Sequence, residues 1–196
     1  ELIQSFNCGV ISQHCDSAQP QIAAQDLGVF GCGYNSDMTA DAPQAHLTAA
    51  IWHWNVYYHT AIEAAMTCGG AENFVNAMGG QAYYGGLAEG FVGVSPLNEA
   101  TVAPGTQEAI DQVTDLIVSG EWDVFTGTKL HITVGEDGTA TIEQEQADLR
   151  CDGQELVDGA LVERDPVVVA AGGESVEDSV ITGSMNYFVE GVVSAN

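Results

Sequence analysis

The sequence predicts an α/β fold built on a parallel sheet, and two observations support this prediction. Short apolar segments of strand length alternate with segments of helical character, and strands separated by helices form right-handed βαβ units. The chain of 196 residues is 45% hydrophobic, with 23 glycines and only 16% charged residues. This composition is typical of a compact chain that buries one sizeable core or makes two small lobes.

The first part of the chain contains three expected strands and two expected helices. The strands are GVIS (9–12), VFGCGY (29–34) and LTAA (47–50). The helices are SAQPQIAAQDLG (17–28) and IWHWNVYYHTAIEAAMTCGG (51–70), and each ends in glycine. Open parallel sheets bind ligands beyond the carboxyl ends of their strands. Function is therefore expected in SQHCDS and GYNSDM, at the ends of the first two strands.

The rest of the chain changes character near residue 128. A glycine-rich loop (69–90) leads to a strand in GFVGVSP and then to a helix from Pro104 to Ser119. The segment KLHITVGEDGTATIEQE (129–145) alternates around a glycine-bounded turn, which indicates an antiparallel hairpin. Residues 145–180 are acidic and without clear period, and MNYFVEGV closes the chain. We therefore expect an added β-hairpin and assign no element to residues 145–180.

The charge balance restricts the partners of the chain. Only three Lys and Arg residues oppose 28 Asp and Glu residues, giving a formal net charge of −25. Such a surface repels phosphate backbones and anionic lipids, so nucleic acid and membrane-surface partners are not expected. An acidic, solvated face that keeps the protein soluble explains this charge, and a salt-rich habitat is the narrower alternative.

The cysteines and histidines form no recognisable metal motif. The five cysteines include no CxxC pair, and a disulfide framework would leave one thiol over. His53 and His59 are six residues apart and point to different sides of a helix. We therefore expect no metal and no cofactor. No apolar run is long enough to span a membrane, and the chain begins without a methionine or a basic signal region, so we expect a targeting segment upstream.

Three adjacent residues, His14, Cys15 and Asp16, have the side chains of a catalytic or metal site. Neighbours in an extended segment point to opposite faces, so His14 and Asp16 can share a face while Cys15 turns away. Adjacent residues seldom reach the geometry of a Cys–His dyad. Ligand contact is therefore favoured over nucleophilic catalysis, and a structural role is the alternative.

Further candidates lie at the second strand end and on the long helix. Asp37 can bind a ligand's donors or cap a helix beginning near Ala40. The rings of Trp54, Tyr57 and Tyr58 recur at helical spacing, which favours core packing, with a stacking wall for a flat ring as the alternative. The segment YYGGLAEG offers two tyrosines, Tyr83 and Tyr84, and the free backbone amides of Gly85 and Gly86.

Five segments, taken in order, resemble one known family. They are VISQHCDSAQPQIAAQDLGVFGCGYNSDM, HLTAAIWHWNVYY, GGLAEGFVGVSPLN, DVFTG and MNYFVEGV. They are similar to the BMP family, the basic membrane lipoprotein or PnrA-like solute-binding proteins of ABC importers. The resemblance implies a type I periplasmic-binding-protein fold, with two α/β lobes around a cleft. It implies a purine nucleoside or free purine as ligand, an ABC transporter permease as partner, and an extracytoplasmic, lipoprotein location.

The resemblance also assigns residues and regions. It implies that Asp37 is the ligand carboxylate of the SDM motif, with His14 and Asp16 in the loop of the QHCDS motif. The other implied ligand residues start the long helix or lie in the glycine loop: Trp54, Asn55, Tyr84, Gly85 and Gly86. The chain is expected to comprise mostly the C-terminal lobe: a ligand-binding α/β lobe (1–90), a crossover strand and helix of the other lobe (91–120), and a return to the first lobe with the hairpin (121–196). The family's first lobe is expected before residue 1.

We therefore expect a binding protein without catalysis. A ligand-sensing domain of the same fold is the main alternative, and a nucleoside hydrolase using His14 and Asp16 is a weaker one. Half of a two-lobed fold would leave an apolar face exposed, so a homodimer or a marginally stable monomer is expected.

Overall fold

The computed structural model describes residues 2–192. The chain forms two compact units, which we call unit 1 (Glu1–Gln107) and unit 2 (Glu108–Asn196). Unit 1 holds a parallel-stranded sheet flanked by helices, which confirms the predicted α/β class. The expected divisions at residues 90 and 120 concern lobes of a larger protein and stay a prediction.

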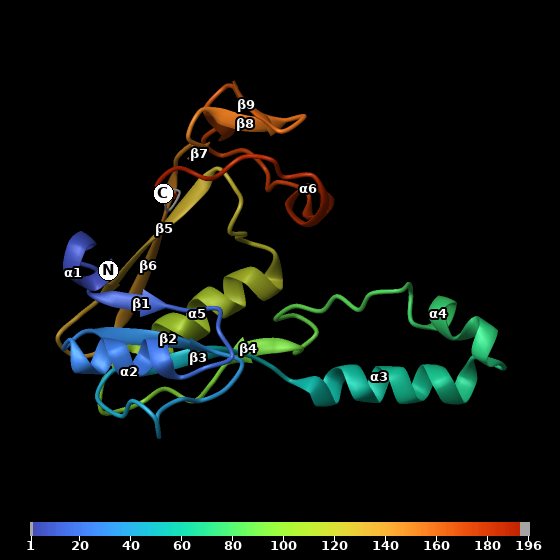
Figure 1. Ribbon diagram of the computed structural model, residues 1–196, viewed down its shortest axis with the longest axis horizontal. Coiled ribbons are helices and arrows are strands. Elements are labelled where there is room, and N and C mark those ends of the chain that lie inside the picture. The colour runs from blue at the N-terminus through green and yellow to red at the C-terminus, as the bar shows by residue number, and fades with distance from the viewer. Residues whose placement is uncertain (1, 193–196) are drawn as a thin grey trace. The chain divides into compact units, whose positions relative to one another are not determined.

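The sheet of unit 1 has four strands in the order of the chain (Figure 1). They are β1 (Val10–Ser12), β2 (Phe30–Tyr34), β3 (His46–Trp52) and β4 (Val92–Val94). The first three are parallel and in neighbouring positions, while β4 runs antiparallel to β3. The predicted parallel sheet is thus confirmed, and the antiparallel edge strand is an addition to it.

The helices of unit 1 follow the expected order with shifted ends. They are α1 (Leu2–Phe6), α2 (Gln19–Asp26), α3 (Trp54–Thr67), the short 3-10 helix η1 (Ala71–Asn73) and α4 (Phe74–Ala77). The long helix was expected from residue 51 but begins at Trp54, because Ile51 and Trp52 pair with β4. Pro20 lies in the first turn of α2, where its missing N–H costs no hydrogen bond. The predicted loop 69–90 contains η1 and α4.

Small side chains form the centre of unit 1. Ala24, Ala42 and Ala45 are fully buried and in contact, with Val29 packed against them. Alanine side chains let α2 approach β1 and β2 closely. In contrast, α3 leaves the end of β3 and runs away from the sheet, with α4 beside its far end (Figure 1). The sheet and α2 therefore form the solid part of this unit.

Unit 2 consists mainly of antiparallel hairpins. The helix α5 (Thr106–Ser119) is followed by the expected hairpin of β5 (Thr128–Val134) and β6 (Ala140–Gln146). The segment without an assignment contains β7 (Leu149–Arg150), β8 (Gln154–Val157), β9 (Ala160–Glu163), β10 (Val167–Val169) and α6 (Asp178–Gly183). Strands of two to four residues are too short to show a period in the sequence. None of the helices among residues 2–192 combines the length and the apolar character needed to cross a membrane.

Candidate functional site

The candidate site lies at one edge of the sheet of unit 1, which we call the carboxyl edge. The parallel strands β1, β2 and β3 end there at Ser12, Tyr34 and Trp52, and the antiparallel β4 begins there at Val92. Asn35 adopts a left-handed conformation (φ 65°), which ends β2 and turns the chain outward. The loops that were expected to carry function thus leave the sheet at the same edge.

A row of aromatic rings crosses the carboxyl edge. The imidazole of His14 meets Tyr34 edge to face at 4.3 Å between ring centroids, and Tyr34 meets Trp52 in the same way at 5.1 Å. The row continues from Trp52 to Trp54 at 6.0 Å. It therefore links the ends of β1, β2 and β3 to the start of α3. Edge-to-face contacts of this kind stabilise each pair by about 0.5–1.5 kcal/mol beyond burial alone.

The row extends from Trp54 into the glycine loop. Trp54 meets Phe91 at 5.6 Å, and Phe91 meets Tyr83 at 5.1 Å. We call these seven rings the ring row: His14, Tyr34, Trp52, Trp54, Tyr57, Tyr83 and Phe91. Trp54 keeps 47% of its surface exposed and Tyr58 keeps 57%. The helix aromatics are therefore not a closed core.

Asp37 lies in the loop after β2, with 46% of its side chain exposed. Its Oδ1 accepts hydrogen bonds from the Thr39 backbone N–H (2.8 Å) and hydroxyl (2.6 Å), which hold the pKa of the carboxyl below its ordinary value. The expected helix near Ala40 is wrong, because residues 39–41 form a turn that Asp37 closes. Among the described residues, the hydrogen bonds of Asp37 all involve Oδ1. Its Oδ2 can therefore accept donors from a ligand.

A shallow cavity of about 360 Å³ lies between the loops after β1 and β2. It contains Asp16 and part of the ring row, and its lining comprises Asp16, Ser17, Ala18, Tyr34, Asn35, Ser36, Met38 and Asp41. A volume of this size is at the lower end of the range for small-molecule sites. The structure thus brings Asp16 and the two loops together around the cavity, whereas His14 and Asp37 are not among its lining residues.

The glycine loop differs from what the sequence indicated. The Gly86 N–H, expected to be free, donates to Glu89 Oε2 at 2.6 Å, which lowers the pKa of that carboxyl. A Cβ at Gly85 would lie 2.9 Å from the Cβ of Phe91, so glycine is needed here for packing against the ring row. Tyr84 is 79% exposed, while its neighbour Tyr83 joins the ring row. Asn55 lies exposed in the first turn of α3.

Sequence reasoning missed one buried residue beside Asp37. His46, the first residue of β3, has no exposed side-chain surface, and its Nε2 lies 3.5 Å from Asp37 Oδ1. Burial lowers the pKa of this imidazole, against the opposing effect of Asp37 and Asp41. A single histidine before an apolar segment has no spacing pattern that would have marked it.

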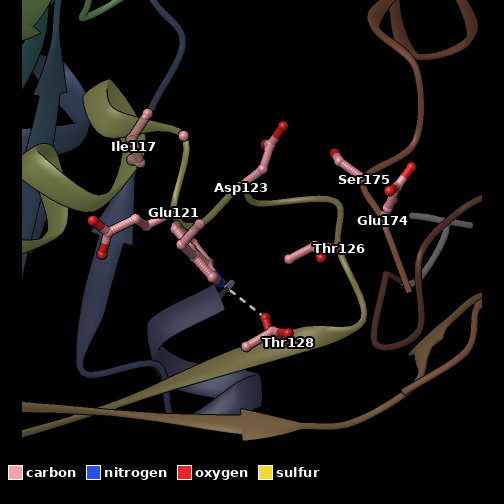
Figure 2. A pocket seen from close by; sticks show the side chains of 9 residues that line it. Ile117, Glu121, Asp123, Thr126, Thr128, Glu174 and Ser175 are labelled. Atoms are coloured by element: carbon pink, nitrogen blue, oxygen red, sulfur yellow. Dashed lines mark hydrogen bonds between the residues drawn. The ribbon is translucent and has the colours of Figure 1, made fainter. Parts of the chain in front are cut away.

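Unit 2 contains a separate cavity of about 400 Å³ (Figure 2). Three carboxylates, those of Glu121, Asp123 and Glu174, lie around it, and the indole N–H of Trp122 is bonded to the Thr128 carbonyl at 2.9 Å. None of the residues predicted for ligand binding lines this cavity. The three carboxylates disfavour binding of an anion in this cavity, and none of its lining residues lies at the carboxyl edge.

The chemistry available at the carboxyl edge is that of a binding site. Aromatic faces can stack on a flat ring, and the Asp37 carboxylate can accept N–H or O–H donors. All five cysteines are free, and Cys15 is exposed. Among residues 2–192, no group of three or more His, Cys, Asp or Glu side chains is placed to hold a metal ion.

Part of this chain is similar to known proteins. A family model described as ABC transporter substrate-binding protein PnrA-like, Bmp, matches residues 2–124. A purine-binding protein of Brucella abortus is 31% identical over 119 residues, 60% of this chain and 31% of that protein. A Haloferax volcanii protein, named as a candidate ABC transporter glucose-binding protein, is 29% identical over 124 residues, 62% of this chain and 29% of that protein. The chain thus matches less than a third of the length of each relative.

Proposed function

Because this chain belongs to the Bmp family of PnrA-like ABC transporter substrate-binding proteins, we propose that it binds a purine nucleoside or a free purine at the carboxyl edge of unit 1. In this proposal it delivers the ligand to an ABC importer without changing it chemically. The observation that carries the proposal is the pairing of a half-exposed ring row with the open Oδ2 of Asp37. Stacking would hold the flat base, and the carboxylate would fix its donors.

The charge distribution supports a neutral ligand. Residues 1–107 contain no lysine and no arginine, so unit 1 has no permanently charged basic side chain to pair with a phosphate group. The net charge of −25 would also repel a nucleotide. A nucleoside or base has the same aromatic ring and N–H donors without that charge. The proposal therefore excludes nucleotides from the ligand class.

The family also supports the wider setting that we propose. Substrate-binding proteins of this kind act outside the cytoplasm and pass their ligand to a permease. We propose the same location and partner for the protein that contains this chain, and attachment as a lipoprotein. We further propose that residues 1–90 belong to the ligand-binding lobe, that residues 91–120 contribute to the other lobe, and that residues 121–196 return to the first.

A sugar is the second candidate ligand, because the Haloferax volcanii relative is named for glucose binding. An exposed tryptophan face and a carboxylate that accepts two hydroxyl groups also suit a pyranose ring. The two ligand classes differ in their rings: a purine is aromatic and stacks on tryptophan through its π-face, whereas glucose has a saturated ring.

The test is a titration of the 196-residue chain with inosine, guanosine, hypoxanthine and glucose, followed by tryptophan fluorescence and calorimetry. We expect saturable binding of the purine ligands, with weak affinity, and no binding of inosine monophosphate. Saturation by glucose alone would replace the purine proposal with the sugar. Steady release of hypoxanthine from inosine would instead indicate a hydrolase.

A further inference from the structure

A continuous path of buried polar side chains runs beneath the carboxyl edge. It begins at Gln13 in the loop after β1, passes through Gln21 on α2 and ends at His46 beside Asp37. Gln21 and His46 have no exposed surface. Gln21 Nε2 lies 3.0 Å from Gln13 Oε1, and Gln21 Oε1 lies 3.4 Å from His46 Nδ1. Two loops that are distant in sequence are thus connected through the interior.

The hydrogen bonds of this path have one consistent direction. Gln21 uses both amide hydrogens, on Gln13 Oε1 and on the Cys32 carbonyl, so its Oε1 must accept from His46. His46 therefore carries its proton on Nδ1, and its Nε2 accepts the N–H of Met38 at 3.4 Å. The neutral imidazole thus has a hydrogen-bond partner at each ring nitrogen. This matters because an unpaired polar group in the interior costs about 1–3 kcal/mol.

The outer end of the path holds the loop after β1. Gln13 donates its two amide hydrogens to the carbonyls of Cys15 (3.1 Å) and Ser17 (2.8 Å). These carbonyls flank Asp16, a predicted ligand residue. The inner end holds Met38, the residue next to Asp37. Both predicted ligand loops are therefore fastened to the same buried side chains.

The glycines of β2 make room for this path. Gly31 and Gly33 are buried on the same face of the strand. A Cβ at Gly31 would lie 2.3 Å from Gln21 Oε1, and a Cβ at Gly33 would lie 3.1 Å from both His46 Cε1 and Met38 Sδ. A side chain at Gly31 would force Gln21 to move, and one at Gly33 would require His46 or Met38 to shift slightly. The alternating glycines of FGCGY thus leave the space that Gln21 and His46 occupy beneath the site.

The backbone of His46 is fixed independently of its side chain. Its carbonyl accepts hydrogen bonds from Asn98 Nδ2 at 2.9 Å and from the Thr101 hydroxyl at 2.6 Å. Asn98 also donates to the Pro43 carbonyl at 2.9 Å. His46 is therefore held twice: its backbone by the loop after β4, and its imidazole by Gln21 of α2.

We propose that His46 and Gln21 are positioning residues of the binding site, which hold Asp37 and the loop after β1 in one fixed arrangement for the ligand. This inference rests on the proposed function, because it takes Asp37 as a ligand group. A second proton on His46 would disturb the arrangement. Nε2 would then lose the Met38 N–H as a donor and would turn its own N–H to Asp37 Oδ1, 3.5 Å away. Asp37 and Asp41 are the charged groups that act on this imidazole; the contacts from α2 and from the loop after β4 are neutral.

The test uses three variants of the full chain and two control variants. His46→Asn keeps a polar group near the Nδ1 position, and His46→Gln keeps one near the Nε2 position, so each preserves one end of the path. Gly31→Ala pushes Gln21 aside without removing a functional group. Gly9→Ala, where a Cβ would meet nothing within 4 Å, is its matched control. His59→Gln, on an exposed histidine paired with Glu63, is the control for the histidine variants.

The first readout is hydrogen exchange of the Met38 amide in the ligand-free chain, followed by NMR. We expect faster exchange in His46→Asn and in Gly31→Ala, and unchanged exchange in Gly9→Ala and His59→Gln. Unchanged exchange in all four variants would overturn the proposal, whatever the binding results. This arm does not depend on a ligand, so failure of inosine to bind would count against the proposed function alone.

The second readout is the dissociation constant for inosine between pH 8 and pH 4.5. We expect affinity about three- to tenfold weaker in His46→Gln and Gly31→Ala than in the parent, as for coupled members of one hydrogen-bond network. In the parent chain the affinity should also fall as the pH drops through the pKa of folded His46, which burial holds below 6.5. This dependence should be smaller in His46→Gln but not in His59→Gln. Equal affinity and equal pH dependence in the parent and His46→Gln would overturn the positioning role while leaving the ligand assignment intact.

Discussion

The rings of Tyr34 and Trp52 meet edge to face, with centroids 5.1 Å apart and ring planes at 86°, at the carboxyl ends of the neighbouring strands β2 and β3. Their contact follows from the parallel register, in which Tyr34 pairs with Ala50 and the last residues of both strands reach the same edge. Trp54 extends this contact onto α3 with about half of its surface exposed. The strand ends thus supply a wall of rings, and Trp54 is one of its exposed members.

The first prediction concerns that wall. Trp54→Leu removes an aromatic face and keeps an apolar side chain at the first position of α3. We expect the affinity for inosine to fall by about tenfold, because stacking of a base on an aromatic ring is worth about 1–3 kcal/mol. Calorimetry measures the effect. Trp122→Phe, in the cavity of unit 2, is the control and should bind like the parent.

The second prediction concerns Asp37. Asp37→Asn keeps an oxygen that can accept from Thr39 and replaces Oδ2 with an N–H donor. The turn should therefore survive, with a nearly unchanged melting temperature. The affinity for inosine should fall by about one to two orders of magnitude, since a charge-assisted hydrogen bond contributes about 1.5–3 kcal/mol. If Asp37→Asn binds like the parent and like the control Asp26→Asn, Asp37 is not the ligand anchor.

The ends of the parallel strands and the carboxylate after β2 could be predicted because they depend on local patterns. Short apolar segments mark β1 and β2, and an Asp directly after such a segment lies at the ligand edge of the sheet. The ring contacts of Phe91 and the burial of His46 depend on pairing between segments that are distant in sequence. For example, the Asn98 side chain holds the His46 carbonyl. No local pattern encodes such contacts.

The strand β2 carries one further local pattern. Gly31 and Gly33 alternate within a strand, where glycine has poor propensity, and this indicates that another group approaches the backbone closely. In the structure these groups are Gln21 and His46. The helix expected at Ala40 failed for the opposite reason: the Asp37–Thr39 turn satisfies the same cap preference without a helix.

The third prediction concerns the pH dependence of stability. The pKa of His46 in the folded chain lies below its ordinary value of 6.5, so the unfolded chain binds more protons between these two values. The contribution of His46 is therefore fully present above pH 6.5 and is lost as the pH falls through this window. Asp37, whose folded pKa lies below 3.8, acts only at lower pH.

Urea unfolding between pH 7.5 and pH 5 measures this dependence. We expect the free energy of unfolding to fall with decreasing pH by at most about 1.4 kcal/mol per pH unit for one proton. His46→Gln should show a smaller slope, whereas His59→Gln should keep that of the parent. An identical slope in His46→Gln would mean that His46 takes up its proton equally in both states.

The fourth prediction concerns salt. All three basic residues lie in unit 2, and the two arginines already have acidic partners: Asp148 and Glu190 lie 3.7 and 4.0 Å from Arg150, and Glu155 lies 3.9 Å from Arg164. The 28 acidic residues far outnumber the three lysine and arginine side chains that could neutralise them. Raising the salt concentration from dilute buffer to about 1 M shortens the Debye length to about 3 Å and should raise the melting temperature markedly. A flat response in calorimetry would show that the carboxylates are already dispersed.

The fifth prediction concerns self-association through α3. Tyr58, Ile62 and Met66 follow each other at four-residue spacing on one face of this helix, with 57%, 61% and 81% of their surfaces exposed. Such a stripe is costly to leave in water, at about 25 cal/mol per Å² of apolar surface, and a second copy of the stripe would cover it. Because the stripe is small and the chain carries a net charge of −25, we expect a weak dimer that strengthens as salt screens the repulsion.

Sedimentation velocity at low and high salt measures this association. Ile62→Glu, at the centre of the stripe, should abolish the dimer, whereas Val118→Glu, which makes the same change at a half-exposed position of α5, should leave it unchanged. Equal association of the two variants would show that the dimer, if one forms, does not use α3, and a parent chain that stays monomeric at high salt would show that the stripe does not bind itself.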